Sequence, residues 1–176
     1  MIRNFSEDDI KSILAVYQRS FREYPWFEDL TNDELKERWR VGRSKPGFEC
    51  FIYEVSGTVA GVIWWDVITL ERLLSERGNR LANFVKLNYS ESILIWEREV
   101  MVHPSFQGRG VATKLREFLV ERMRKNLNKT LILTRAREDN FGMIKISKKM
   151  SFQQTGIKKA SSQKEGVFHE YWYLNV

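Results

Sequence analysis

The sequence predicts an α/β domain with a mixed sheet, and three observations support that fold class. Runs with helical spacing of apolar residues alternate with short runs rich in aromatic and β-branched residues. Hydrophobic residues make up 43% and aromatic residues 13% of the 176 positions, enough to bury a sizeable core. The chain has no internal repeat, no linker rich in proline or serine and no low-complexity tract. We therefore interpret residues 1–176 as a single domain.

The first half of the chain predicts two helices and then a hairpin. A near-capping box at residues 6–9 opens the first helix, and a capping box at Thr31 opens the second. Residues 48–55 and 59–68 are rich in aromatic and β-branched residues and flank a short turn at Gly57, as two paired strands would.

The second half predicts further helices and strands in alternation. Helical spacing begins at Leu70 and is interrupted at Gly78, where a first short helix can end. The predicted strands are residues 92–102, 130–136, 152–158 and 167–174, and the predicted helices are residues 70–87, 111–125 and 140–150.

The formal charge of +6 indicates a polyanionic partner, which is a nucleic acid, an anionic membrane or a phosphorylated cofactor. The basic residues are dispersed among acidic ones and no nucleic-acid-binding motif is present, so we expect no nucleic acid. The longest apolar stretch, residues 59–65, is far too short to cross a bilayer, and the first residues do not read as a targeting peptide. We expect a cytoplasmic protein without a membrane partner.

A metal is not expected either. One cysteine and two histidines are too few ligands for a structural zinc site, and one cysteine cannot form an internal disulfide. We interpret Cys50 and His103 as structural residues.

The segment from residue 100 to residue 113 ends a predicted strand, turns through two glycines and enters a helix. Such a turn aims free backbone N–H groups and the positive end of the helix dipole at one point, which suits a phosphate. Gly108 and Gly110 allow close approach of the chain, and Arg109 adds a charged side chain. The nucleotide-triphosphate loop and the dinucleotide fingerprint are both excluded by their missing residues. A plain tight turn before a helix is the alternative on glycine spacing alone.

Two motifs carry more information than the glycines. Gln107, Gly110 and Ala112 follow the pattern Arg/Gln-x-x-Gly-x-Gly/Ala, and residues 100–104 follow the upstream pattern hydrophobic-x-Val-x-Pro. A second block, Asn-x-x-Ala-x-x-Leu-Tyr-x-Lys-x-Gly-Phe, is echoed at Asn140, Met143, Ile146, Lys149 and Phe152. With the order of elements, these motifs make the chain resemble the GNAT superfamily of acyl-CoA N-acyltransferases.

The resemblance implies a mostly antiparallel mixed sheet with splayed fourth and fifth strands and helices on both faces. It implies acetyl-CoA as co-substrate, with its pantetheine arm in the split and its phosphates near the turn, Lys114 and Arg116. Coenzyme A is a polyanion, which gives the positive net charge a reason. The residues that the resemblance assigns to acetyl-CoA are Val100, Met101, Val102, Gln107, Gly108, Arg109, Gly110, Val111, Ala112, Thr113 and Asn140.

The family joins an amine directly to the thioester carbonyl, so deprotonation of the amine needs the most help. A lysine-like amine of pKa about 10.4 costs about 4.6 kcal/mol to deprotonate at pH 7, against about 2 kcal/mol for releasing the thiolate. Glu97 and Glu99 are the candidate bases, two residues apart and nominally on one face of a strand. The alternative is that both glutamates lie on a solvated or salt-bridged face of the sheet and take no part in catalysis. Because the family usually has a β-bulge in this strand, alternation does not show which residues face the cleft. Backbone N–H groups near residues 100–102 are expected to hold the oxyanion.

Two positions depart from the family pattern. Ser147 stands where the family often carries the tyrosine that protonates the thiolate, and we expect Ser147 not to act as an acid. The thiolate is then protonated by water, by Tyr171 or by Tyr173, or it leaves without an acid. Arg135 stands where the branch that acetylates protein N-termini commonly has a glutamate, which disfavours that branch.

The acceptor is expected to be a small cationic amine or a peptide amine. Tyr24, Trp26 and Phe27 are the candidate substrate residues, because aromatic faces among carboxylates such as Asp66 suit a cation. Their alternative role is to cap the core. Residues 70–90 are expected to form a helical cover over the acceptor rather than a core element.

A catalytically silent regulator that binds acyl-CoA is the other function that the resemblance leaves open, because the usual tyrosine is missing. The acyl chain and the acceptor's identity are not determined by the sequence. A homodimer is left open as well.

Overall fold

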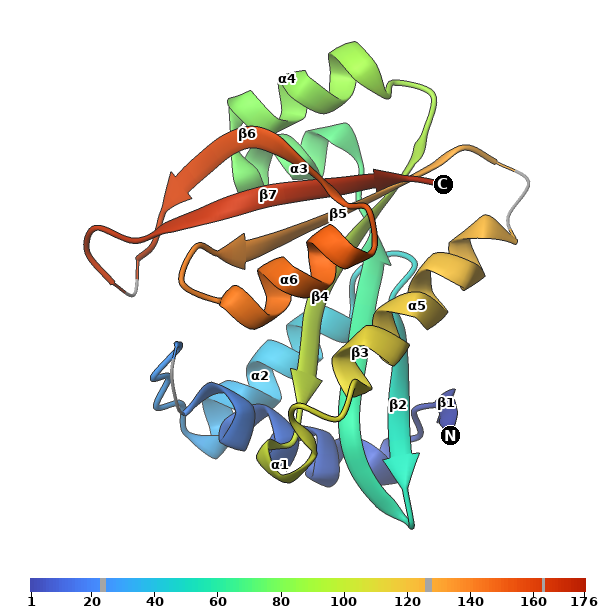
Figure 1. Cartoon of the computed structure of the whole chain (residues 1–176), viewed down its shortest axis with the longest axis vertical. Coiled ribbons are helices and arrows are strands. Elements are labelled where there is room, and N and C mark those ends of the chain that lie inside the picture. Colours follow the sequence, from blue (N-terminus) through green and yellow to red (C-terminus); the bar gives the residue numbers. More distant parts are fainter. Residues whose placement is uncertain (23–24, 126–127, 163) are drawn as a thin grey trace. The chain divides into compact units, whose positions relative to one another are not determined.

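The computed structural model describes residues 1–22, 25–125, 128–162 and 164–176 (Figure 1). Its strands are β1 (Ile2–Asn4), β2 (Glu49–Val55), β3 (Thr58–Val67), β4 (Ile93–Val102), β5 (Thr130–Arg137), β6 (Gln153–Ala160) and β7 (Phe168–Asn175). Its α-helices are α1 (Ile10–Phe21), α2 (Asn32–Arg43), α3 (Leu70–Arg77), α4 (Asn79–Asn88), α5 (Val111–Arg124) and α6 (Phe141–Lys149). Two short 3₁₀ turns are η1 (Glu7–Asp9) and η2 (Pro104–Phe106).

The strands form a seven-stranded sheet in the order β1-β2-β3-β4-β5-β7-β6. The β1–β2, β2–β3, β5–β7 and β6–β7 ladders are antiparallel, and the β4–β5 ladder is parallel. The predicted mixed, mostly antiparallel sheet is therefore confirmed. The sequence analysis missed β1, whose three residues are too few for a periodic pattern and are held by pairing with β2.

The β4–β5 ladder covers only the first half of each strand. It pairs Ile93–Trp96 with Thr130–Leu133, four residues from each strand, whereas β4 continues to Val102 and β5 to Arg137. The end of this ladder lies where the predicted splay between the fourth and fifth strands begins.

The contacts of the chain divide it into two units, which we describe separately. The first consists of residues 1–66 and 98–119, and the second of residues 67–97 and 120–176. That all of residues 1–176 make a single domain stays a prediction.

In the first unit, α1 and α2 share a core with β2, β3 and Met101 of β4. The predicted caps are present: the Ser6 N–H donates to the Asp9 carboxylate at 2.7 Å, and the Glu34 N–H donates to the Thr31 hydroxyl at 3.3 Å. Helix α5 comes very close to β3, because a Cβ at Gly61 would lie 2.6 Å from Val111 Cγ1. Only glycine fits this position without displacing a neighbour.

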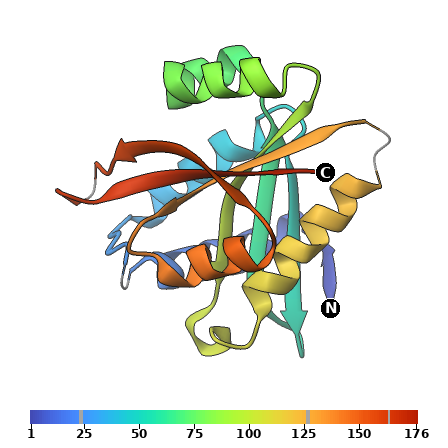
Figure 2. The ribbon, with the colours of Figure 1, turned by 45° about the horizontal axis from the view of Figure 1, so that its top comes forward.

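In the second unit, α3 and α4 lie side by side, and α4 also contacts β6 (Figure 2). The helices meet at Gly78, whose φ of 97° favours glycine, so the predicted break is confirmed. Leu73, Leu81 and Val85 are at most 1% exposed and share a core with β4, β5 and β7. The expectation that residues 70–90 are not a core element is therefore wrong, and that they cover an acceptor stays a prediction. Their apolar stripe is what buries this part of the sheet.

We predict that Leu73→Ala lowers the free energy of unfolding by about 3 kcal/mol, because it leaves a cavity in the second core. Leu74→Ala is the matched control: Leu74 is 45% exposed, and its loss should cost less than about 0.5 kcal/mol. Urea denaturation of both variants measures the difference. Equal, small losses would contradict a core role for α3.

Candidate functional site

The turn between β4 and α5 has the backbone geometry expected of an anion cradle. Gly108 and Gly110 have φ of 73° and 78°, in the left-handed region that favours glycine. A Cβ at either glycine would meet no atom within 4 Å, so the backbone faces open space there. The Lys114 N–H donates to Gly110 O at 3.0 Å as the first turn of α5 closes, which leaves the preceding N–H groups of that turn without an intrahelical partner.

The side chains near this turn hold it together and add charge. The Gln107 side-chain amide donates to Val102 O at 3.3 Å and ties the turn to the end of β4. The guanidinium of Arg109 lies 5.6 Å from the centre of the Phe106 ring. Lys114 Nζ donates to the Tyr53 hydroxyl at 3.2 Å. Arg116 is 1% exposed, so, unlike Arg109 and Lys114, it is not a surface charge available to a phosphate.

The two candidate bases have different neighbours. Glu97 is 4% exposed, and its carboxylate accepts a hydrogen bond from the Thr134 hydroxyl at 2.9 Å, one residue beyond the β4–β5 ladder. Glu99 has a side chain that is 21% exposed and lies 3.8 Å from the Arg38 guanidinium of α2. Glu97 is thus held inside the second unit and Glu99 in the first.

Glu99 belongs to a group of charged and phenolic side chains in the first unit. Arg38 donates to Glu28 at 3.1 Å, and the Tyr17 hydroxyl donates to the same Glu28 oxygen at 3.2 Å. Burial, and then the negative charge of Glu99, raise the pKa of Tyr17, so its hydroxyl stays protonated. The Arg38 guanidinium also lies 5.2 Å from the centre of the Tyr17 ring. Glu99 therefore sits beside a partly exposed cation and a hydroxyl donor.

Asp66 does not serve the role in which the sequence analysis placed it. It is fully buried and forms a two-pronged ion pair with Arg98, whose Nη2 donates to Asp66 Oδ2 at 2.9 Å. This pair fastens the end of β3 to β4. The expectation that Asp66 attracts a cationic acceptor is wrong, because its charge is already neutralised inside the unit.

The predicted substrate residues lie in the segment that joins α1 to α2. Tyr24 is outside the described residues. Trp26 packs against Phe21 with 5.4 Å between ring centres and adds to the first core. Phe27 is 66% exposed at a φ of 50°, an unusual backbone conformation for a residue of this size. Whether Trp26 and Phe27 contact the acceptor stays a prediction.

The second motif block places its residues on α6. Asn140 is the N-cap of this helix, and its side-chain oxygen accepts from the Met143 N–H at 3.2 Å. Ser147 lies in α6 and is fully buried. A role for Asn140 toward acetyl-CoA stays a prediction, and it comes in addition to the structural role of the cap.

The sequence analysis missed a group of basic and aromatic side chains in the second unit. Arg135 of β5 is directly opposite Tyr171 of β7, and Arg137 is opposite His169. Burial, and then the charges of Arg135, Arg137 and Arg77, lower the pKa of His169 to about 4. The spacing of two between Arg135 and Arg137, and between His169 and Tyr171, was visible in the sequence. The pairing of β5 with β7 that brings the four residues together was not.

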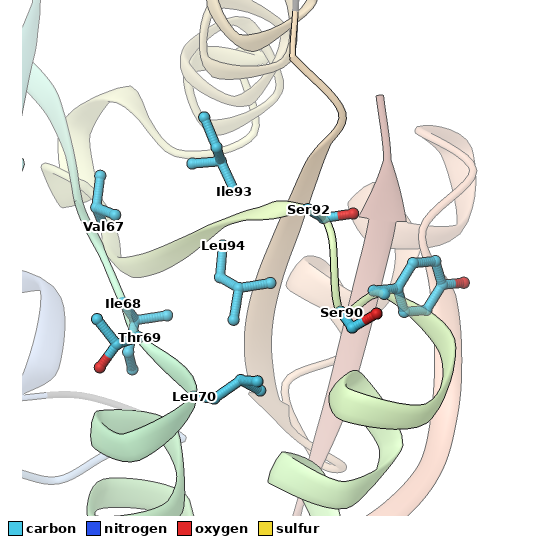
Figure 3. Close-up of a pocket in the computed structure, with 9 residues that line it drawn as sticks. Val67, Ile68, Thr69, Leu70, Ser90, Ser92, Ile93 and Leu94 are labelled. Atoms are coloured by element: carbon cyan, nitrogen blue, oxygen red, sulfur yellow. The ribbon is translucent and has the colours of Figure 1, made fainter.

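A shallow hollow of about 290 Å³ lies where α3 and β4 begin (Figure 3). Its polar side chains are hydroxyls from Thr69, Tyr89, Ser90 and Ser92, beside apolar ones such as Leu94. It contains no acid, base or cation, so we assign it no part in the chemistry. Across the described residues no cluster of three or more potential metal ligands occurs, and no helix has the length and apolarity to span a membrane.

Comparison with known proteins finds one family and one fold. The model of the acetyltransferase (GNAT) family matches residues 10–152. An uncharacterized N-acetyltransferase of Methanocaldococcus jannaschii is 24% identical over 160 residues, which cover 90% of this chain and 62% of the relative. The chain thus spans less than two thirds of that relative's length.

Solved structures extend the similarity to the whole chain. The ribosomal-protein-alanine N-acetyltransferase of Brucella melitensis has a TM-score of 0.73 at 20% identity, covering 100% of this chain and 99% of its own. The structure of yncA from Salmonella typhimurium with its cofactor acetyl-CoA has a TM-score of 0.70 at 17% identity, covering 99% and 92%. At such identities the similarity shows a shared fold.

The charge arrangement around His169 gives a testable pH dependence. Folding lowers the pKa of His169 from 6.5 to about 4, so its neutral ring contributes stability that is full above pH 6.5 and is lost as the pH falls toward 4. We predict that Arg135→Gln raises the midpoint above 4, because one of the depressing positive charges is removed. An NMR titration of the His169 ring protons measures this midpoint. Arg124→Gln, an exposed arginine at the end of α5, is the control; a midpoint equal in all three proteins would contradict the arrangement.

Proposed function

Because the chain belongs to the acetyltransferase (GNAT) family, we propose that it is an N-acetyltransferase that moves the acetyl group of acetyl-CoA to a primary amine. The observation that carries this proposal is the turn from Gln107 to Thr113. Its two glycines with positive φ open the backbone to an anion at the start of α5. A pyrophosphate fits such a cradle, and Arg109 adds a positive charge beside it.

The residues of the chain supply three things to this reaction. The turn holds the phosphates, and the backbone of residues 100–102 offers N–H groups to the oxygen that becomes negative when the amine attacks the thioester carbon. A glutamate takes the proton from the attacking amine. As the thioester C–S bond breaks, the sulfur leaves with the bonding electrons as the thiolate of coenzyme A, and the acetyl group remains on the amine nitrogen.

Glu99 and Glu97 are both candidates for the base, and their surroundings differ in a way that matters. Glu99 is partly exposed, so it can pass a proton to solvent, and the Arg38 guanidinium lies 3.8 Å from its carboxylate. Glu97 is buried and accepts a hydrogen bond from the Thr134 hydroxyl. It can therefore contact the attacking amine only if the acceptor reaches this buried position. We rank Glu99 first for this reason.

A catalytically silent regulator that binds acyl-CoA is the second candidate function. The buried Ser147, in the place of the tyrosine acid typical of the family, favours it. Release of a thiolate needs little assistance at pH 7, however, so the missing acid is tolerable for an enzyme. Turnover with a panel of amines separates the two functions.

We predict that acetyl-CoA stabilises the folded protein through the turn. At about a hundredfold excess over the dissociation constant, a ligand that binds only the folded state adds about 2.7 kcal/mol. Gly110→Glu should abolish the thermal shift, because it puts a carboxylate where the pyrophosphate binds.

Gly166→Glu is the matched control, since Gly166 also has a positive φ, 72°, and open space at its Cβ. It should carry the same backbone strain and leave the thermal shift with acetyl-CoA intact. No shift for the unmodified protein at millimolar acetyl-CoA, or equal losses in both variants, would contradict the assignment of the turn.

We predict that replacing the base by glutamine lowers turnover at least about tenfold at pH 7 and much less at pH 9.5, where the free amine is plentiful. Glu99→Gln and Glu97→Gln are measured side by side by thiol release. Glu91→Gln, whose side chain is 82% exposed, is the control and should have no effect. Equal losses at both pH values would remove a glutamate from proton transfer.

A further inference from the structure

One face of the sheet in the second unit brings basic, phenolic and aromatic side chains together. Arg135 pairs with Tyr171 across the β5–β7 ladder, and Arg137 pairs with His169. Side chains two residues apart on a strand share a face, so all four lie on one side. Trp96 of β4 pairs with Leu133 of β5 and lies on the same side. This is the face that α3 and α4 cover in part.

Within this group, the hydroxyl of Tyr171 is buried without a partner. Tyr171 is 1% exposed, and its hydroxyl oxygen has no hydrogen-bond partner among the described residues. Burial raises the pKa of Tyr171 despite the nearby charges of Arg77 and Arg135, so the hydroxyl keeps its proton. A buried donor with nothing to donate to is costly in a folded protein. This hydroxyl therefore points to a ligand that accepts a hydrogen bond.

Arg135 is the neighbouring cation, and its guanidinium is also unpaired. No carboxylate in the described part of the chain lies within ion-pair distance of Arg135, which is exposed. Arg137, two residues on, shows the contrast, because it binds Asp139 through two hydrogen bonds of 2.9 and 2.7 Å. The chain thus neutralises one arginine of β5 and leaves the other, opposite Tyr171 on β7, without an ion-pair partner among the described residues.

The side chains around Arg135 and Tyr171 add a further positive charge and packed aromatic rings. The Arg77 guanidinium of α3 lies 4.4 Å from the centre of the Trp96 ring, and that ring lies 6.2 Å from the Tyr171 ring. The acidic groups nearby already have partners: Glu76 lies 3.9 Å from Arg77, and Asp139 binds Arg137. His169 is neutral at pH 7. The electrostatic potential around Arg135 and Tyr171 is therefore positive, which favours an anionic ligand.

We propose that Arg135 and the Tyr171 hydroxyl bind the carboxylate of the acceptor, so that the acceptor is an amine that carries a carboxylate, as an amino acid does. A carboxylate accepts hydrogen bonds and donates none, which matches a guanidinium beside a phenol. The identification of this ligand as the acceptor rests on the proposed function, whereas the carboxylate site itself does not. It narrows the expected acceptors, since an amine without an anionic group would leave both donors unsatisfied.

The position of the pair along β5 agrees with this role. Arg135 comes two residues after Leu133, the last β5 residue paired with β4. Arg135 therefore lies just past the end of the β4–β5 ladder. In an α-amino acid the amine is a single carbon from the carboxylate, so a site that holds the carboxylate also fixes where the amine of the same molecule lies.

The direct test measures binding without turnover. N-acetylated amino acids are compared with their carboxamides by isothermal titration calorimetry, because each pair differs only in the carboxylate. We expect at least one carboxylate to bind about tenfold more tightly than its amide. Arg135→Gln and Tyr171→Phe should each remove that preference. No carboxylate preferred over its amide, or a preference that survives both substitutions, overturns the proposal.

Two controls separate recognition from general effects of charge and packing. Arg124→Gln removes an exposed arginine, and Tyr173→Phe removes a hydroxyl that donates to Gln153; both should keep the preference. Tyr171→Phe should fold with an unchanged or higher melting temperature, because the hydroxyl it loses has no partner within the chain. Tighter binding of inorganic phosphate than of every carboxylate would overturn the choice of ligand.

Kinetics distinguish failure of this proposal from failure of the proposed function. With acetyl-CoA and matched amino acids and amino amides, Arg135→Gln should raise the KM of the amino acid about tenfold and leave that of the amide unchanged. If both acceptors turn over equally well, the function stands and the carboxylate site falls. If nothing is acetylated while the carboxylate preference in binding persists, the function falls and the anion site stands. A fall in kcat of Tyr171→Phe with both acceptors would make this phenol the acid instead.

Discussion

The close approach of α5 to β3 at Gly61 is the contact on which the first unit depends. A Cβ at this position would lie 2.6 Å from Val111 and 3.0 Å from Met101 O, so the absence of a side chain lets helix and strand touch. Val111 is the first residue of α5. The same contact that packs the helix therefore fixes where the helix starts, and with it the direction in which the turn through Gly108 and Gly110 faces.

Charged groups with a partner inside the protein differ from those without one. Asp66 and Arg98 neutralise each other where water is excluded, and Arg137 is neutralised by Asp139. These pairs hold strands and turns in place, and breaking either would leave a buried charge without compensation. Arg135 and Tyr171 have hydrogen-bonding capacity that the described chain does not use. Under our proposal, a ligand's carboxylate uses this capacity, which would make the pair a binding site rather than a structural support.

The two candidate glutamates show how a small difference in setting changes the chemistry available. They are separated by one residue of β4, yet Glu97 binds a hydroxyl in a buried position while Glu99 faces a cation at the partly exposed edge of a charged group. A base must exchange its proton with water after each turnover. Exposure, rather than position in the motif, is therefore what ranks them.

The sequence by itself determined the order and type of every helix and strand except β1, the caps at residues 6–9 and 31–34, and the two-glycine turn that leads into α5, because each depends on residues close together in the chain. It assigned the wrong role to Asp66 and denied the helices of residues 70–90 a role in the core. Both roles depend on partners far along the chain, Arg98 for Asp66 and the strands of the second core for the helices. Only the tertiary structure decided these, since burial and pairing are properties of the assembled sheet. The register that sets Arg135 opposite Tyr171 is of the same kind, and a shift of one residue would have turned both side chains to the other face.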